Sequence, residues 1–102
     1  MKLMTKTVQK ALPALYSQDG KGDDAIVHAK FFTPWSNWTW FVMETDGDLC
    51  FGIVEGHETE YGYFTVSELA AVKGPMGLTI ERDIHWKAET VGSLKAAGII
   101  KL

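Results

Sequence analysis

The chain has little of what disulfide frameworks, zinc clusters and nucleic-acid recognition require. It contains one cysteine, Cys50, and one arginine, Arg82, among its 102 residues. A single cysteine forms neither an internal disulfide nor a zinc cluster. No apolar run reaches the ~18–20 residues of a membrane helix, and the first residues lack the apolar stretch of a signal peptide. We therefore expect one cytoplasmic domain over residues 1–102, with no metal or cofactor.

Basic residues are absent from the middle of the chain. Residues 34–72 hold seven acids and no lysine or arginine, whereas residues 1–33 and residues 73–102 each hold five bases and three acids. Duplex binding draws affinity from lysine and arginine, so the sequence argues against double-stranded nucleic acid as a ligand. The balance of 13 acids against 10 bases also argues against a carboxylate-covered mimic of DNA. The acidic block either pairs with lysines on flanking elements or forms an acidic surface.

The N-terminal segment has the periodicity of a helix. Apolar residues at spacings i, i+3, i+4 and i+7 share one face over residues 5–17. Thr5 or Thr7 suits the position of the N-cap. Pro13 removes a hydrogen bond and clashes with the preceding turn, so we expect the helix to stop near Ala11 or to restart at the proline.

The alternation of apolar and polar residues predicts four successive strands. Their expected ranges are 25–33, 38–45, 48–55 and 61–64. Asp46-Gly47 predicts a two-residue type I′ hairpin turn, which explains the surrounding acids without a calcium ion. Together these strands form an antiparallel meander.

The remaining residues predict short helices and one more strand. Thr65 and Glu68 match a capping box at the start of a short helix, and residues 78–86 alternate as a fifth strand. Thr90 suits the N-cap of a last helix. We expect residues 88–102 to form a peripheral C-terminal helix. The fold class is therefore α+β, with a mostly antiparallel sheet of four to five strands, an N-terminal helix and short helices packed on one face.

Several separate blocks of the chain, in order, resemble a known family. The blocks are 12–16 (LPALY), 30–40 (KFFTPWSNWTW), 51–58 (FGIVEGHE), 60–64 (EYGYF), 67–69 (SEL), 77–78 (GL) and 80–83 (IERD). They resemble a domain-of-unknown-function family of small bacterial proteins, often carried on plasmids and other mobile elements. The resemblance covers about residues 2–87. It brings no catalytic residue, cofactor or substrate, and implies a cytosolic accessory protein that serves a mobile element.

Three of the four tryptophans fall within residues 32–40 and form the first candidate site. Tryptophan is enriched at binding hot spots because a broad rigid ring carries a polar handle. Trp35 lies in the break between two strands, beside Asn37, whereas Trp38 and Trp40 share one strand face. The alternative is that Trp38 and Trp40 belong to the core and that Asn37 binds loop backbone.

A histidine among carboxylates forms the second candidate site. The residues are Glu55, His57, Glu58, Glu60 and Tyr61. Such a group is able to transfer protons in general acid–base chemistry. Its spacing fits no zinc motif, and the alternative interpretation is a solvated turn.

The single arginine and the single cysteine are the remaining candidates. Arg82 suits bidentate binding of an anionic ligand, or it pairs with Glu81, Asp83 or an acid of the meander. Cys50 lies inside a strand pattern, where it is expected to act as a small apolar residue. We predict no catalytic residue.

The leading hypothesis is a non-enzymatic interaction or regulatory module of a mobile genetic element. Eight of the twelve aromatic residues lie in the acidic block, a combination that suits docking on a basic protein surface such as that of a nucleic-acid enzyme. One alternative is a small enzyme or anionic-ligand-binding protein. Its residues would be His57, Glu58, Glu60, Tyr61 and Arg82. A third hypothesis is single-stranded nucleic acid stacked on the tryptophans.

Overall fold

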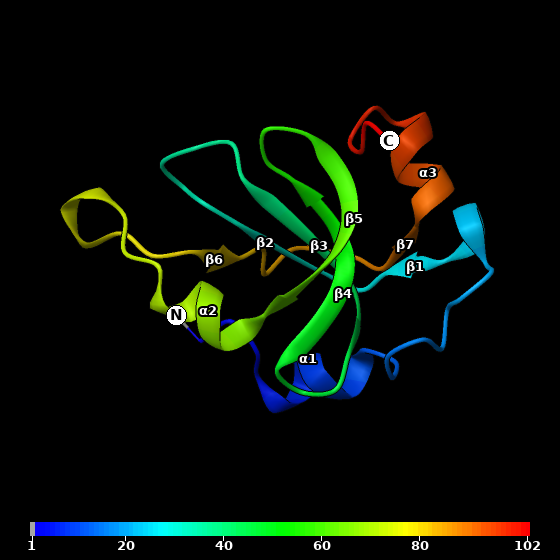
Figure 1. Cartoon of the computed structure of the whole chain (residues 1–102), viewed down its shortest axis with the longest axis horizontal. Coiled ribbons are helices and arrows are strands. Elements are labelled where there is room, and N and C mark those ends of the chain that lie inside the picture. Colours follow the sequence, from blue (N-terminus) through cyan, green and yellow to red (C-terminus); the bar gives the residue numbers. More distant parts are fainter. Residues whose placement is uncertain (1) are drawn as a thin grey trace.

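The computed structural model describes residues 2–102 and has an α+β fold (Figure 1). Its helices are α1 (Lys6–Ala11), α2 (Val66–Ala71) and α3 (Val91–Ala96), with 3₁₀ turns η1 (Gly22–Asp24) and η2 (Pro75–Gly77). Within the described chain, none of these helices has the length and apolar character to cross a membrane. The predicted fold class, with its N-terminal helix and short helices, is confirmed.

One five-stranded antiparallel sheet forms the centre of the molecule, in the order β5-β4-β3-β2-β6. Its strands are β2 (Ala29–Phe32), β3 (Thr39–Thr45), β4 (Leu49–Glu55), β5 (Thr59–Thr65) and β6 (Glu81–Arg82). A separate antiparallel pair joins β1 (Ile26–Val27) to β7 (Glu89–Thr90). The predicted meander is present as β2, β3, β4 and β5, and β5 and β6 lie at opposite edges of the sheet.

The turn between β3 and β4 differs from the prediction. A two-residue type I′ turn requires positive φ at both Asp46 and Gly47, but only Gly47 has it, at 119°. Four residues lie between the last paired positions of the two strands. The Asp46 Oδ1 atom accepts the backbone N–H groups of Asp48 (3.1 Å) and Leu49 (2.9 Å). The aspartate side chain therefore closes a longer turn.

Two further predicted strands are shorter in the structure. Residues 25–33 are divided at His28, so that β1 pairs with β7 while β2 pairs with β3. The expected strand 78–86 reduces to the two residues of β6. It ends because Asp83 forms a turn, in which its Oδ1 atom accepts the His85 backbone N–H (2.9 Å) and its carbonyl accepts the Trp86 backbone N–H (3.2 Å).

The N-terminal helix ends before Pro13, as expected. Thr5 caps α1, because its Oγ1 atom accepts the Val8 backbone N–H at 3.2 Å. Leu12 is the C-cap and has an extended backbone conformation, which suits the residue before a proline.

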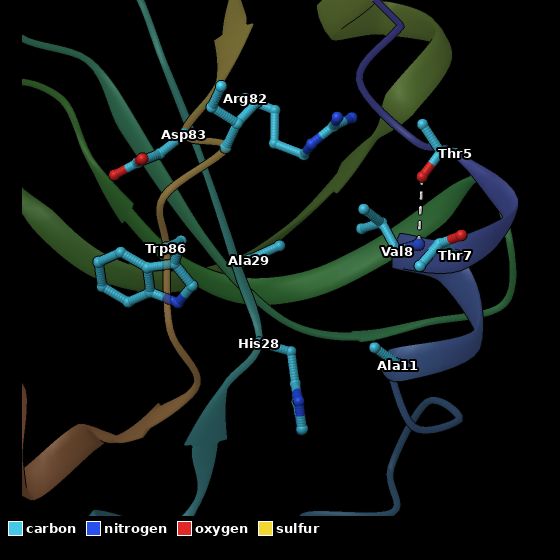
Figure 2. Close-up of a pocket in the computed structure, with 10 residues that line it drawn as sticks. Thr5, Thr7, Val8, Ala11, His28, Ala29, Arg82, Asp83 and Trp86 are labelled. Carbon is cyan, nitrogen blue, oxygen red and sulfur yellow. Dashed lines mark hydrogen bonds between the residues drawn. The ribbon is translucent and has the colours of Figure 1, made fainter.

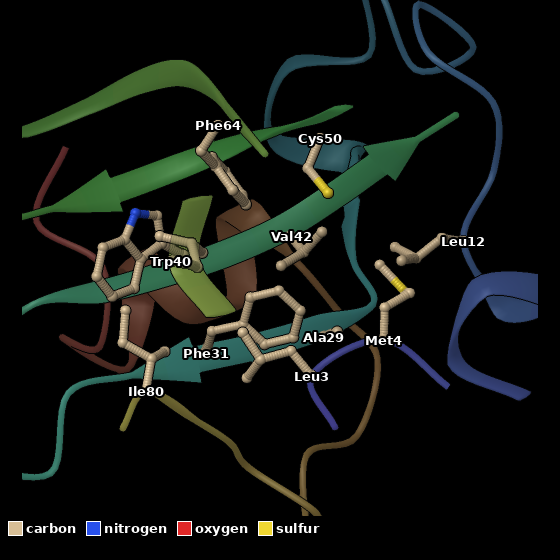
Figure 3. Close-up of a cluster of buried hydrophobic side chains, with 11 residues drawn as sticks. Leu3, Met4, Leu12, Ala29, Phe31, Trp40, Val42, Cys50, Phe64 and Ile80 are labelled. Atoms are coloured by element: carbon tan, nitrogen blue, oxygen red, sulfur yellow. The ribbon is translucent and has the colours of Figure 1, made fainter. Parts of the chain in front are cut away.

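Buried apolar side chains pack on both faces of the sheet because successive residues of a strand point to opposite sides. Trp40 and Val42 of β3 belong to a first cluster, whereas Phe41 and Met43 belong to a second. The first cluster (Figure 3) contains Leu3, Met4, Leu12, Ala29, Phe31, Trp40, Val42, Cys50, Phe64, Leu69 and Ile80. The second contains Ala25, Val27, Phe41, Met43, Ile53, Val91, Leu94 and Ile100. The N-terminal segment thus covers one face and α3 the other.

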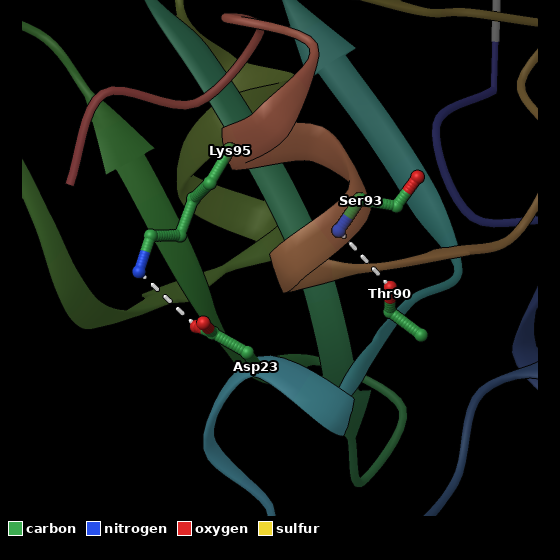
Figure 4. Close-up of polar contacts among 4 residues, drawn as sticks. All are labelled: Asp23, Thr90, Ser93 and Lys95. Carbon is green, nitrogen blue, oxygen red and sulfur yellow. Dashed lines mark hydrogen bonds and ion pairs between the residues drawn. The ribbon is translucent and has the colours of Figure 1, made fainter.

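The C-terminal helix is capped at its start and joined to η1 by an ion pair near its end (Figure 4). Thr90 caps α3, as predicted, with its Oγ1 atom accepting the Ser93 backbone N–H at 3.1 Å. Lys95 forms an ion pair with Asp23 of η1, with 3.1 Å between Nζ and Oδ1. Two of the helix residues are buried in the second cluster, so α3 contributes to the core.

Candidate functional site

The three tryptophans of the predicted aromatic segment pack against the protein. Trp40 is a core residue, and Trp38 stacks on it with ring centroids 5.9 Å apart and 28° between the planes. The Trp35 ring lies against Gly74, within 2.5 Å of the position that a Cβ atom would take there. Trp35 and Trp38 are partly exposed, and Asn37 is exposed. None of these three indoles stands free of the surface.

The loop between β4 and β5 brings part of the second candidate group together. His57 is exposed and its ring meets the edge of Trp38, with centroids 5.5 Å apart. These two residues line a hollow of about 240 Å³ with Glu58 and Glu60. The side chains of Glu58 and Glu60 are exposed, and nothing in residues 2–102 donates a hydrogen bond to them. The Glu55 carboxylate instead accepts the backbone N–H of residue 101 (3.3 Å), which is a structural contact.

Arg82 lies away from this group. It belongs to β6, whereas the histidine loop leads into β5 at the opposite edge of the sheet. Its Nη1 atom donates to the backbone carbonyls of Lys2 (2.6 Å) and Leu3 (2.8 Å). The arginine therefore holds the N-terminal segment, and the structure does not bring it to His57.

A second hollow, of about 380 Å³, lies between α1 and β6. Figure 2 shows that Arg82 extends toward the N-terminal segment, while Asp83 and His28 point in other directions. Burial lowers the pKa of the His28 imidazole. Because these side chains do not converge on one point, the hollow lacks a positioned acid–base pair.

Cys50 is buried in the first cluster, with its sulfur 3.4 Å from the Thr45 hydroxyl. Burial raises the pKa of the Cys50 thiol; the hydrogen bond with Thr45 opposes this, and the charges of Asp48 and Asp46 add to it. A buried thiol with a raised pKa is a poor nucleophile. In the part of the chain that the structure describes, no group of three or more His, Cys, Asp or Glu side chains is placed to hold a metal ion.

The carboxylates of the acidic block are not neutralised by ion pairs. Within residues 2–102, the one ion pair under 4.0 Å joins Lys95 and Asp23, and both lie outside the block. Carboxylates inside the block accept backbone N–H or hydroxyl groups instead, as Asp48 does from Ser67 (2.9 Å). The expectation that flanking lysines pair with this block is therefore wrong. Its negative charge is left without cationic partners in the described chain.

Tyrosines, rather than tryptophans, form the exposed aromatic surface. Tyr61 and Tyr63 of β5 are 44% and 52% exposed, and Tyr16 is 62% exposed. The Phe51 ring of β4 stacks on Tyr61, with centroids 5.8 Å apart and 8° between the planes, and lies 5.0 Å from Tyr63. Of these residues, only Tyr61 belonged to a candidate site predicted from the sequence. Strand alternation shows that Tyr61 and Tyr63 share a face, but it does not show whether another element covers that face.

A buried glutamate lies beside these rings. Glu44 is 2% exposed, and its two carboxylate oxygens each accept one backbone N–H at 2.8 Å, from Tyr16 and Gln18. The Gln18 side chain in turn donates to the carbonyls of Ile26 (2.9 Å) and Met43 (3.0 Å). These bonds fix the loop that follows α1. Sequence reasoning missed this role, since the bonds of Glu44 span 26 to 28 residues.

A family model described as "Protein of unknown function (DUF2958)" matches residues 3–97. The chain belongs to the DUF2958 family. The match runs past residue 87, where the resemblance in the sequence was expected to end, and takes in all of α3. No curated protein and no solved structure matches the chain.

In this DUF2958 chain, exposed aromatic residues lie on one face of β5, and exposed acidic residues lie on its other face and in the loop before it. We call this region the hairpin edge, defined by Phe51, Glu58, Glu60, Tyr61 and Tyr63. Because β5 is an edge strand, side chains on both of its faces reach solvent. Rigid rings and unpaired carboxylates suit contact with a cationic surface.

Proposed function

We propose that the protein is a non-enzymatic binding module that docks on a basic protein surface through the hairpin edge. One observation carries this proposal: the edge strand β5 exposes Tyr61 and Tyr63 on one face and Glu60 on the other, with Glu58 exposed in the loop before it. No lysine or arginine of residues 2–102 pairs with these two carboxylates. Tyrosine rings supply contact area at low entropic cost. Unpaired carboxylates favour a basic partner and speed the encounter with it.

The partner in this proposal is a protein with a basic face, such as a nucleic-acid enzyme. Such enzymes carry lysine and arginine to neutralise phosphates, and those residues complement the hairpin edge. The setting we propose is the cytoplasm of a bacterium, where the protein acts as an accessory or regulatory factor of a plasmid or another mobile element. The block-by-block resemblance in the sequence supports this setting.

The hollow at His57 supports a second candidate function, that of a small enzyme or ligand-binding protein. His57 lies there with Glu58, Glu60 and Trp38. Arg82, which this alternative includes, is at the opposite edge of the sheet, so anion binding would lack its cation. Substitution of His57 by alanine distinguishes the two functions, because docking through the hairpin edge does not need the imidazole.

The test of the proposal is affinity capture from a bacterial host, followed by binding measurements with the purified partner. The variant Glu58→Lys/Glu60→Lys reverses two exposed charges of the hairpin edge. The matched control, Asp24→Lys/Glu89→Lys, makes the same change in charge elsewhere on the surface. We expect the wild type, the control and His57→Ala to bind alike, and the hairpin variant to bind at least about tenfold more weakly.

Salt dependence provides the second readout of this experiment. Binding of the wild type should weaken as ionic strength rises, because salt screens the charges of both partners. Equal binding by the hairpin variant and the wild type would contradict the proposal. Loss of binding in His57→Ala alone would favour the second candidate function.

A further inference from the structure

A third hollow, of about 440 Å³, opens between the loop after α1 and the surface of β3, β4 and β5. The rings of Phe51 and Tyr61 line one part of it, and the loop residues Gly20 and Gly22 line another. Both glycines have positive φ, at 79° and 52°, and an added Cβ atom would meet nothing within 4 Å at either position. The loop therefore leaves this hollow open.

The carboxylates at this hollow have no cationic partner. Glu44 and Asp19 both line it. Buried carboxylates in proteins are usually paired with a cation, yet no lysine or arginine of residues 2–102 lies within 4.0 Å of the buried Glu44. Each of its oxygens accepts one backbone N–H bond, whereas a carboxylate offers about four acceptor positions. Asp19 is exposed and available at the rim.

The negative charges of Asp19 and Glu44 affect the pKa of the nearby Tyr63. A hydrogen bond with the Tyr16 hydroxyl raises the pKa of Tyr63, and burial and the charges of Asp19 and Glu44 raise it further. The hollow thus combines a parallel aromatic wall with a negative field. This combination attracts a cation that is also able to stack on a ring.

We propose that this hollow receives an arginine side chain of the protein partner. The planar guanidinium stacks on an aromatic face, while its donors reach carboxylate oxygens. Lysine offers a compact, strongly hydrated charge without a face to stack, so it fits the wall less well. The inference rests on the proposed function and names the kind of residue on the partner that the module recognises.

The experiment is an NMR titration of the ¹⁵N-labelled full chain with small probes. N-acetyl-arginine amide is compared with N-acetyl-citrulline amide, which has nearly the same shape without the charge, and with N-acetyl-lysine amide. We expect the arginine probe to shift the amide signals of Gly20, Gly22 and Tyr61 in a saturable way. The citrulline and lysine probes should bind at least about fivefold more weakly.

Variants separate the contributions of ring and charge. Tyr61→Ala should weaken arginine binding about fivefold, and Tyr61→Phe should retain it, because the ring face and not the hydroxyl makes the contact. Asp19→Asn removes an exposed charge without disturbing the bonds of Glu44, and should also weaken binding. His57→Ala, in a different hollow, should leave it unchanged.

Three results would overturn the inference: no saturable shift, equal binding of the citrulline probe, or binding of the lysine probe as tight as that of the arginine probe. The failure of the inference is distinguishable from that of the proposed function. Glu58 and Glu60 do not line this hollow, so their reversal tests docking independently of arginine binding. If the charge-reversed variant still binds the partner while the titration succeeds, the docking proposal alone is wrong.

Discussion

Met76, like Tyr16, has a left-handed backbone conformation that does not suit a residue with a Cβ atom. It lies in η2, between α2 and β6, 99% exposed and with φ at 57°. A left-handed conformation costs a residue with a Cβ atom roughly 1–2 kcal/mol. We predict that Met76→Gly raises the free energy of unfolding by up to about 1 kcal/mol, measured by urea denaturation.

The control for this prediction is Leu78→Gly in the same loop. Leu78 is also exposed but has φ at −67°, so glycine there relieves no strain and only adds freedom to the unfolded chain. Its free energy of unfolding should fall. A similar fall in both variants would contradict the assignment of strain to Met76.

The lowered pKa of His28 predicts that the stability of the protein depends on pH. Burial lowers its pKa in the folded protein, so the unfolded chain takes up the proton at a higher pH than the folded one. Stability is therefore highest above the ordinary histidine pKa of ~6.5 and falls as pH decreases from there toward the lowered value. His28→Gln should reduce the loss of unfolding free energy between about pH 8 and about pH 5.5, by a few tenths of a kcal/mol.

Denaturant titrations at the two pH values check this prediction. The exposed His85 offers the matched substitution, His85→Gln, which should retain the pH dependence of the wild type. If His28→Gln and His85→Gln change the pH dependence equally, burial of His28 is not its cause.

At the residue scale, local signals are predictable from the sequence and distant partners are not. Thr65 and Thr90 were each expected to cap a helix, as was Thr5 or Thr7. Thr5, Thr65 and Thr90 each accept the backbone N–H three residues later. These caps depend on neighbouring residues alone. Glu44 lies within the predicted strand 38–45, but its partners at Tyr16 and Gln18 were not predictable, because they become neighbours only when the chain folds.

At the scale of elements, alanine substitutions at the two paired glycines of β4 and β5 should affect stability differently. Gly52 pairs with Gly62 in the sheet. A Cβ atom on Gly52 would lie 1.9 Å from the Phe41 carbonyl oxygen, whereas one on Gly62 would meet only a Val54 methyl at 4.0 Å. Gly52→Ala should lower the free energy of unfolding by about 3 kcal/mol or more, and Gly62→Ala should change it by less than about 0.5 kcal/mol.

Thermal and urea unfolding of the two alanine variants check this contrast. Because the substitutions are identical and occupy paired positions, differences in the unfolded chain largely cancel. Equal stability of the two variants would show that β3 and β4 do not approach as closely at Gly52 as the structure places them.

The strands were predictable as elements, but their ends and turns were not. Alternation along residues 38–64 indicates the meander correctly, since a strand's side-chain period is a local property. The predicted strand 25–33 is divided at His28 because β1 pairs with β7, which lies more than 60 residues later in the sequence. The turn at Asp46 depends on hydrogen bonds from backbone N–H groups to the aspartate side chain. The preference of Asp-Gly for type I′ turns does not take these bonds into account.

At the scale of the whole molecule, α3 completes the second face of the sheet. Leu94 is 1% exposed and packs in the second cluster. We predict that Leu94→Ala lowers the free energy of unfolding by about 2–4 kcal/mol, because it leaves a cavity. Leu102→Ala, at a residue that is 45% exposed, should cost less than about 1 kcal/mol. Equal small losses in both variants would mean that the C-terminal helix is peripheral, as the sequence suggested.

The covering of the two sheet faces also explains why the candidate surface was only partly predictable. The acidic block is visible in the sequence, and so is its wealth of aromatic residues. Which rings reach solvent depends on how the helices cover the sheet. Trp40 is buried in the first cluster, and Trp38 and Trp35 pack against that cluster. Tyr61 and Tyr63, on the edge strand, remain exposed.

The central claim is that the hairpin edge docks on a basic protein surface. Cross-saturation NMR on the complex of the ¹⁵N-labelled chain with its captured partner tests this most directly, because it maps the contact residue by residue. The account predicts that the amides losing intensity cluster in residues 56–63 and around Phe51. Loss of intensity centred on Arg82 and β6, at the other edge of the sheet, would contradict it.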